Sequence, residues 1–362
     1  MSAKDMIRTW SDCIKERLLP GMSAHQLPAV AAVSLAMALA RHCASGVIAG
    51  HLISERDSKV ASRRRRAERL IANSRCDAEQ WSAVLCRQVT ANFSGLPLVI
   101  IVDETPGPGN LLCLKVTLGY HHRTLPLAWC CYRSGALREP MPHLIERLLR
   151  QVVAAIDVTQ HPTITLLADR GLAWPSLLDL CVELGLSYVL RVQGATHVCT
   201  SDGQEHRADH WTQRKGQRFA AAVKVFKKAG WRQTHLLATW PHQCKEPWLL
   251  ISDRATLDAA VARYCKRMWC EQSFRDDKSG VWQWQKSRVR DPQRAARLLL
   301  LLALASVLAV MLAAQTIKQG LRKSIDPHRR RRLSYLRLGL RRLQEILLQD
   351  QPLQLPTRLY PP

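Results

Sequence analysis

The sequence predicts an α/β fold, in which buried strands alternate with helices. Two apolar runs support this prediction, at 98–102 (LVIIV) and 164–168 (ITLLA), because short uninterrupted aliphatic runs are typical of strands buried on both faces. Between them, residues 142–156 space their apolar positions as a helix does. With 362 residues, 47% of them hydrophobic, the chain can bury a core of this kind.

The first region, residues 1–92, is predicted to be helical and to bind DNA. Residues 27–48 are rich in Ala, Val and Leu with few helix breakers, which favours packed helices. Residues 54–73 follow as a predicted basic helix that includes the four consecutive arginines at 63–66. Arginines on a helical module are suited to contact DNA phosphates.

The next region, residues 93–193, is predicted to form the first part of an α/β core. The strand at 98–102 and two further strands at 111–118 and 125–132 give a meander, with a polar turn before the third strand. The remaining expected elements are a helix at 142–156, a strand at 164–168, a helix at 175–184 and a strand at 188–192.

The rest of the chain divides by composition. Residues 194–250 are rich in Thr, Gln, Lys and Trp with short alternating runs, which predicts a β insertion. Residues 251–315 return to helical spacing, beginning with a helix over 256–277, and are expected to complete the core. Residues 316–362 are predicted to be a basic helical tail.

One segment, residues 298–314, is apolar throughout except for Ser306. As a helix it would be about 25 Å long, slightly short of a bilayer core of about 30 Å. We therefore expect a helix buried in the core and no stable membrane association. A membrane anchor is the alternative.

Charge and cysteine content indicate the partner and the compartment. Lys and Arg number 53 against 29 Asp and Glu, a formal net charge of +24, which favours an extended polyanion as partner. Solvated basic faces are the alternative explanation. The twelve cysteines form no CxxC pair, so reduced thiols and a cytoplasmic location are expected.

Acidic residues follow both buried strands directly, Asp103 after the first and Asp169 after the second. Carboxylates brought together in this way repel one another, and a divalent cation removes that cost. Mg²⁺ prefers such hard oxygen ligands. Two acids at strand ends are a weak signal when they are taken alone.

A third acid lies on the predicted helix 256–277. Tyr264, Arg267, Glu271 and Lys278 are spaced by three, four and seven residues, which places them on one helix face. Arg275 lies at the margin of this face. Cations beside an acid suit a site where the acid binds metal and its neighbours bind phosphate oxygens. An exposed helix with surface ion pairs is the alternative.

These residues carry a resemblance to a known family. The segment YCKRMWCEQSFRDDK resembles the Y-x2-R-x3-E-x6-K signature of the insertion sequence four family of bacterial DDE transposases, with every signature position filled. VDET around Asp103 and ADRGLAWPSLLDL around Asp169 are similar to the first and second acidic motifs of that family. The resemblance covers roughly residues 60–315.

The resemblance implies a ribonuclease H-like core that brings Asp103, Asp169 and Glu271 together as ligands of two Mg²⁺ ions, for which Mn²⁺ can substitute. It implies that Tyr264, Arg267 and Lys278 contact the DNA backbone near the cut end. The expected partners are double-stranded DNA, as terminal inverted repeats and target, and a second copy of the chain in a homodimer. The implied activity is metal-dependent strand cleavage and strand transfer.

Two points stay open in the sequence. A hairpin intermediate of the cleaved DNA would need a base to leave the base stack. Trp231, in the predicted β insertion, is a candidate aromatic platform on which that base would stack. A place in the hydrophobic core of the insertion is the alternative for Trp231. A non-transposing nuclease, or an inactive or domesticated DNA-binding relative, would share the same fold.

Overall fold

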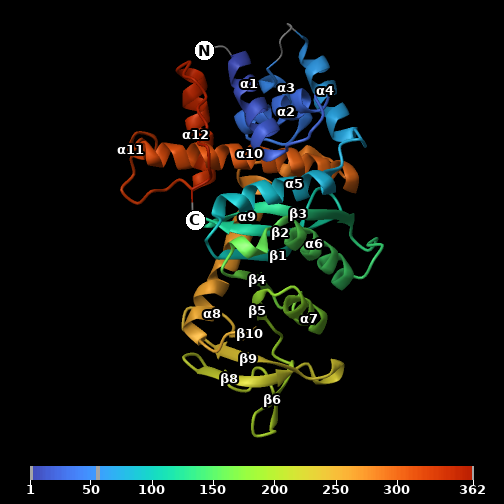
Figure 1. The fold of residues 1–362 in the computed structure, drawn as a ribbon, viewed down its shortest axis with the longest axis vertical. Coiled ribbons are helices and arrows are strands. Elements are labelled where there is room, and N and C mark those ends of the chain that lie inside the picture. The colour runs from blue at the N-terminus through green and yellow to red at the C-terminus, as the bar shows by residue number, and fades with distance from the viewer. Residues whose placement is uncertain (1–2, 54–57, 361–362) are drawn as a thin grey trace.

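The computed structural model describes residues 3–53 and 58–360 (Figure 1). It confirms the predicted α/β class. One ten-stranded mixed sheet runs through the molecule in the order β3-β2-β1-β4-β5-β10-β9-β8-β6-β7. The N-terminal and C-terminal helices gather at the β3 end, and the strands at the other end extend away from them (Figure 1).

The predicted meander is confirmed as β1 (Leu98–Pro106), β2 (Leu111–Tyr120) and β3 (Arg123–Arg133), paired antiparallel. The first strand is longer than expected. Its pairing with β2 continues beyond the apolar run, so Asp103 lies opposite Lys115 inside the ladder and not after the end of the strand. Opposite residues in an antiparallel pair project to the same face, so these two side chains share a face of the sheet.

Parallel pairing places the C-terminal ends of three strands at the same edge of the sheet. β4 (Ile164–Ala168) lies between β1 and β5 (Ser187–Arg191) and is parallel to both. Helices α6 (Met141–Ala155) and α7 (Pro175–Glu183) make the crossovers, as expected. Val102 pairs with Ala168, and therefore Asp103 and Asp169 follow at the same level.

The strands predicted for the insertion continue the core sheet. β10 pairs antiparallel with β5, and β9, β8, β6 and β7 follow outward. Their bounds are β6 (His197–Thr200), β7 (Glu205–Arg207), β8 (Arg218–Val225), β9 (Arg232–Thr239) and β10 (Trp248–Ser252). The insertion therefore lengthens one sheet instead of forming a second one.

The helix predicted over 256–277 is confirmed, because the chain is helical without interruption over 257–280, although its hydrogen-bond pattern changes along the way. Asp276 and Asp277 are both buried, and the wide last turn directs their carboxylates toward cations on β3 and β2. The pieces are α8 (Leu257–Tyr264), the 3₁₀ turn η5 (Cys265–Arg267), α9 (Met268–Arg275) and the π turn η6 (Asp276–Gly280).

The apolar segment forms α10 (Pro292–Lys318), which is longer than the predicted 298–314. It is long and apolar enough to cross a membrane, yet 94% of its most apolar window is buried inside the protein. Helices α2 (Leu27–Ala40), α4 (Val60–Ala72), α5 (Ala78–Thr90) and α12 (Tyr335–Leu348) and strand β3 contact it. The expected burial in the core is thus observed. The bent pair α2 and α3 passes the same composition test when it is taken as one span.

Helices at both ends of the chain pack around α10. The basic helix predicted for 54–73 begins at Val60, and its residues 54–57 lie outside the described part of the chain. The remaining helices are α1 (Ala3–Cys13), η1 (Ile14–Leu18), α2 (Leu27–Ala40), α3 (Ser45–His51), α4 (Val60–Ala72), α5 (Ala78–Thr90), η2 (Ala91–Phe93), η3 (Val158–Gln160), η4 (Lys227–Ala229), η7 (Trp284–Ser287), α11 (Arg322–Ile325) and α12 (Tyr335–Leu348).

Candidate active site

Three carboxylates from three separate elements meet at one guanidinium group. Arg267 Nη2 lies 3.0 Å from Asp103 Oδ2 and 3.1 Å from Asp169 Oδ2, and Arg267 Nη1 lies 2.6 Å from Glu271 Oε1. The arginine side chain is only 10% exposed. The three acids predicted from the sequence are therefore brought together, with the predicted cation among them.

The backbone explains this convergence. Asp103 is on β1 and Asp169 directly follows β4, and parallel neighbouring strands end at the same edge of a sheet. Arg267 ends η5 and Glu271 lies one helical turn later on α9, so both side chains face that edge. Apolar packing of α8 and α9 on the sheet face that includes Ile101 holds the helices in place.

Tyr264 completes the predicted helix face. Its hydroxyl donates a hydrogen bond of 3.0 Å to Asp169 Oδ1, and its ring makes an edge contact with Trp248 at a centroid distance of 5.4 Å. Lys278 lies on the π turn η6 and makes no ion pair with the three acids within the described residues. Arg275 is exposed to solvent at the end of α9. The structure thus gathers two further signature side chains, Tyr264 and Arg267, around the three acids.

The two aspartates differ in acidity. Burial, with repulsion from Asp169 and Glu271, raises the pKa of Asp103 to about 6, although Arg267 opposes the shift. Burial also acts to raise the pKa of Asp169, but the Arg267 guanidinium, the Arg170 N–H and the Tyr264 hydroxyl together lower it below its ordinary value. At neutral pH both groups are therefore able to act as anionic ligands.

The chemistry of these donors fits a divalent metal. All three are carboxylates, the hard oxygen ligands that Mg²⁺ prefers, and they already converge on a cation. Within residues 3–53 and 58–360, no three His, Cys, Asp or Glu side chains are close enough to share an ion as they stand. Since Arg267 lies among the carboxylates, it has to move before they can close on a metal.

Two residues beside the acids were not singled out from the sequence. Arg191 Nη1 lies 3.8 Å from Asp169 Oδ1, and Arg191 Nη2 lies 2.8 Å from Glu246. Glu246 also pairs with Arg170 at 2.8 Å. Arg191 could have been found, because it ends the strand parallel to β4 and so reaches the same edge.

Glu104 is adjacent to Asp103 but belongs to a different environment. It accepts a hydrogen bond from the Tyr132 hydroxyl. Successive residues of a strand point to opposite faces, so Glu104 is directed away from the face that carries Asp103. It is therefore separate from the acidic cluster.

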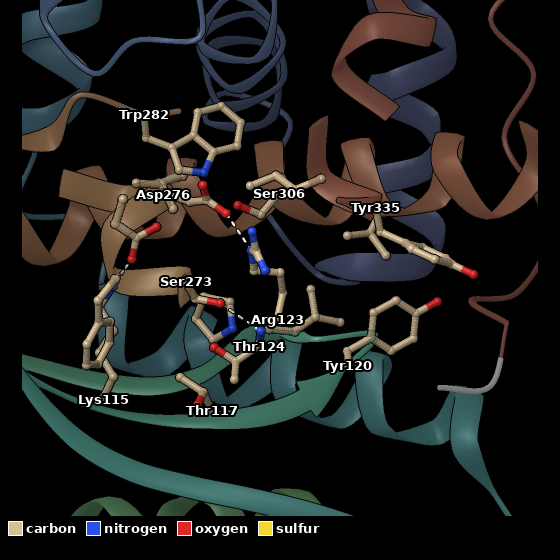
Figure 2. A pocket seen from close by; sticks show the side chains of 17 residues that line it. Lys115, Thr117, Tyr120, Arg123, Thr124, Ser273, Asp276, Trp282, Ser306 and Tyr335 are labelled. Atoms are coloured by element: carbon tan, nitrogen blue, oxygen red, sulfur yellow. Dashed lines mark hydrogen bonds and ion pairs between the residues drawn. The ribbon is translucent and has the colours of Figure 1, made fainter. Parts of the chain in front are cut away.

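Two ion pairs with buried carboxylates connect the C-terminal end of α9 to the sheet (Figure 2). Lys115 Nζ lies 2.6 Å from Asp277 Oδ2, and Arg123 Nε lies 2.7 Å from Asp276 Oδ2. They line a cavity of about 30 Å³, comparable to the volume of one water molecule and too small for a nucleotide. These pairs therefore position α9, and with it Glu271, without touching a substrate.

The structure does not bring Trp231 to the acids. It is half-buried in the turn before β9, while the other end of that strand, Thr239, pairs with Trp248 beside Tyr264. Eight residues separate Trp231 from Thr239, about 26 Å along a strand. Of the tryptophans predicted for the insertion, Trp248 is the one that contacts the site.

Comparison with known proteins identifies the family of this chain. A family model described as the transposase DDE domain matches residues 96–308, which begin just before β1 and end within α10. The matched range includes every acid of the cluster. No curated protein matches the chain. Because the family model covers more than half of the sequence, the chain belongs to the family of transposases with a DDE domain.

Proposed function

We propose that this protein is a DNA transposase of the insertion sequence four family that cleaves and joins DNA strands at the ends of a mobile element. The observation that carries the proposal is the meeting of Asp103, Asp169 and Glu271 at one cationic point. The filled Y-x2-R-x3-E-x6-K signature supports the finer family assignment, and with it a ribonuclease H-like core.

In this proposal Asp103, Asp169 and Glu271 hold two Mg²⁺ ions, which Mn²⁺ can replace. When bound, such ions lower the pKa of an attacking water or 3′ hydroxyl and stabilise the departing oxygen of the phosphodiester. Asp169, which keeps its charge to lower pH than usual, is suited to be the first ligand. Asp103 would be the second aspartate ligand, in its deprotonated form.

The neighbouring side chains are proposed to hold the DNA. Arg267, once released from the carboxylates, contacts a backbone phosphate near the cut end, for which its planar fork is suited. Tyr264 keeps Asp169 oriented and contacts the same strand. Lys278 and the exposed Arg275 contact phosphates further along. We assign Trp231 no role at the cut end, because it lies far from the acids along β9.

The wider organisation is proposed to follow the family. Residues 1–92 would bind DNA, residues 93–193 and 251–315 would form the catalytic core, residues 194–250 would be its β insertion, and residues 316–362 would be a basic tail. The partners would be the terminal inverted repeats, the target DNA and a second copy of the chain. The protein would act in the cytoplasm, on the bacterial nucleoid.

The alternative is a nuclease or a domesticated DNA-binding relative with the same fold. Complete retention of the three acids favours catalysis over loss of activity. A strand-transfer assay separates the remaining possibilities, because only a transposase joins the cleaved end to a target plasmid.

The test is Mg²⁺-dependent cleavage of a labelled duplex that carries the ends of the element. Asp103→Asn, Asp169→Asn and Glu271→Gln are expected to bind this DNA without cutting it. Glu104→Gln is the matched control, because this carboxylate is adjacent to Asp103 but bonds to Tyr132 instead. Equal cleavage by all four variants would show that the three acids are structural.

A further inference from the structure

A basic groove lies apart from the acids, between helices α3 and α4 on one side and the segment that enters α10 on the other. Its volume is about 770 Å³. In Figure 1, α4 stands near the end of α10 at which that helix begins. Six cationic side chains line the groove, and all six are exposed: Arg64, Arg65, Arg69, Lys286, Arg288 and Arg294.

The charge in this groove is largely unpaired. Among the described residues that line it, Glu68 is the one carboxylate, and it is bonded by Arg64 at 2.8 Å and by the Ser45 hydroxyl at 2.9 Å. The five other cations make no ion pair within residues 3–53 and 58–360. Like charges held together in this way repel one another, and an anion from outside would relieve that repulsion.

The two walls of the groove are fixed to each other. Arg297 on α10 is buried, and its Nε donates a hydrogen bond of 2.7 Å to the carbonyl of Ile71 on α4. Trp282 and Trp284 are fully buried and anchor the segment that carries Lys286. The cations on the two sides are therefore held facing one cavity, and they are not loosely tethered.

The groove is also continuous with the catalytic elements. The wall that carries Lys286 begins within η7 and continues to the start of α10, and η7 comes after η6 and the α9 helix that carries Glu271. The ring of Trp284 packs so closely on Gly107 that a Cβ there would overlap it, and Gly107 follows the strand that carries Asp103. A DNA duplex that is bound at the acids and runs along this segment would therefore reach the groove.

We propose that this groove binds the phosphate backbone of double-stranded DNA, as a contact site separate from the acids. The inference rests on the proposed function and adds to it where the duplex lies outside the cutting site. Its basis is the set of unpaired cations on two fixed walls, since neutralised phosphates release counterions and so give strong, salt-dependent binding. Helix α4 is then one half of a binding cleft whose other half belongs to the catalytic core.

The experiment measures how salt affects binding of the full-length protein to a labelled duplex of arbitrary sequence, about 30 base pairs long, between about 50 and 300 mM NaCl. One variant changes the α4 wall, Arg65→Ala with Arg69→Ala. A second changes the opposite wall, Lys286→Ala with Arg294→Ala. The control, Arg214→Ala with Lys228→Ala, removes two exposed cations of residues 194–250 that do not line the groove.

Each groove variant is expected to lower the slope of log affinity against log salt by about 1.8, and to weaken binding at low salt by about 100-fold. The control should change the slope by less than about 0.5. Unchanged thermal unfolding will verify that the variants are folded. The inference would be overturned if the control lost as much DNA affinity and salt dependence as the groove variants. It would also be overturned if only one of the two groove variants showed these losses. If the wild type fails to bind duplex at all, the proposed function falls as well.

Discussion

The guanidinium of Arg267 lies 3.0 Å from the carboxylate of Asp103, and the same group also pairs with Asp169 and Glu271. One arginine therefore neutralises part of the charge of three acids that would otherwise repel one another. The arginine is 10% exposed and Asp103 is 15% exposed, so solvent screens this charge poorly. The contribution of the three acids to the stability of the protein should therefore depend both on Arg267 and on pH.

The first prediction concerns the removal of that cation. Arg267→Ala leaves buried carboxylates without a partner, so we expect it to lower the free energy of unfolding in metal-free buffer by about 3–5 kcal/mol. Mg²⁺ at about 10 mM should restore more stability to this variant than it adds to the wild type, because no arginine has to leave first. Thermal unfolding with and without Mg²⁺ measures both effects.

The control for this prediction is Arg150→Ala. Arg150 pairs with Glu146 and Glu183 at the surface, where ion pairs contribute little, so its loss should change the free energy of unfolding far less than the loss of Arg267 does. It should not change the response to Mg²⁺. An equal Mg²⁺ shift in the wild type and in Arg267→Ala would show that the arginine does not occupy the place of the metal.

The second prediction concerns pH. The pKa of Asp103 is raised in the folded state from 3.8 to about 6, so the folded protein binds more protons than the unfolded chain between these values. Its contribution to stability is therefore complete below about pH 4 and is lost as pH rises through about 6, by up to about 3 kcal/mol without metal. Urea unfolding across this range measures the loss.

Asp103→Asn cannot titrate at this position and should lack that loss. The difference in unfolding free energy between the variant and the wild type should thus change in favour of the variant as pH rises from about 4 to about 7. A difference that does not vary with pH would mean that Asp103 titrates normally in the folded protein.

Much of the fold could be predicted from local sequence. The strands around 98–102 and 164–168 are uninterrupted aliphatic runs, and the structure contains β1 and β4 there. The stripe of Tyr264, Arg267 and Glu271 follows from helical spacing, and these side chains do meet the aspartates. Where a pattern is continuous and short-range, residue spacing is enough to predict the structure.

The features that depend on distant partners could not be predicted in this way. The helical segment that contains Tyr264 ends in a π turn, where Asp276 and Asp277 pair with Arg123 and Lys115, which lie about 150 residues earlier. Strand β1 extends through Asp103 because β2 pairs with it there. The tryptophan content of residues 194–250 could not tell which tryptophan would lie near the acids, since that depends on the order of the strands in the sheet.

The third prediction concerns the ion pair of Lys115 and Asp277 at the C-terminal end of α9. The lysine side chain is 2% exposed and lies over the rings of Phe274 and Trp284, at 5.6 and 5.5 Å. Burial opposes its charge, but Asp277 raises the pKa of Lys115 above its ordinary value, so the lysine stays protonated. Lys115→Met leaves Asp277 buried and unpaired, which should cost about 3–5 kcal/mol in urea unfolding.

Restoring neutrality is the discriminating control. The double change Lys115→Met with Asp277→Asn removes both charges, and it should recover most of the loss because no buried ion remains unpaired. If the double variant is as unstable as Lys115→Met alone, the lysine acts by packing on Phe274 and Trp284 and not by its charge.

The last prediction concerns the close approach of α12 to α10. At Gly339 a Cβ atom would overlap the carbonyl oxygen of Ala309, a backbone atom that cannot rotate away. Gly339→Ala therefore has to displace one helix from the other, with a loss of about 3 kcal/mol or more and faster proteolysis within 335–348. Gly50→Ala on α3 meets no atom within 4 Å and should instead add about 0.5–1 kcal/mol, since alanine favours a helix. A small effect of Gly339→Ala, similar to that of Gly50→Ala, would mean that α12 does not dock on the buried helix in solution.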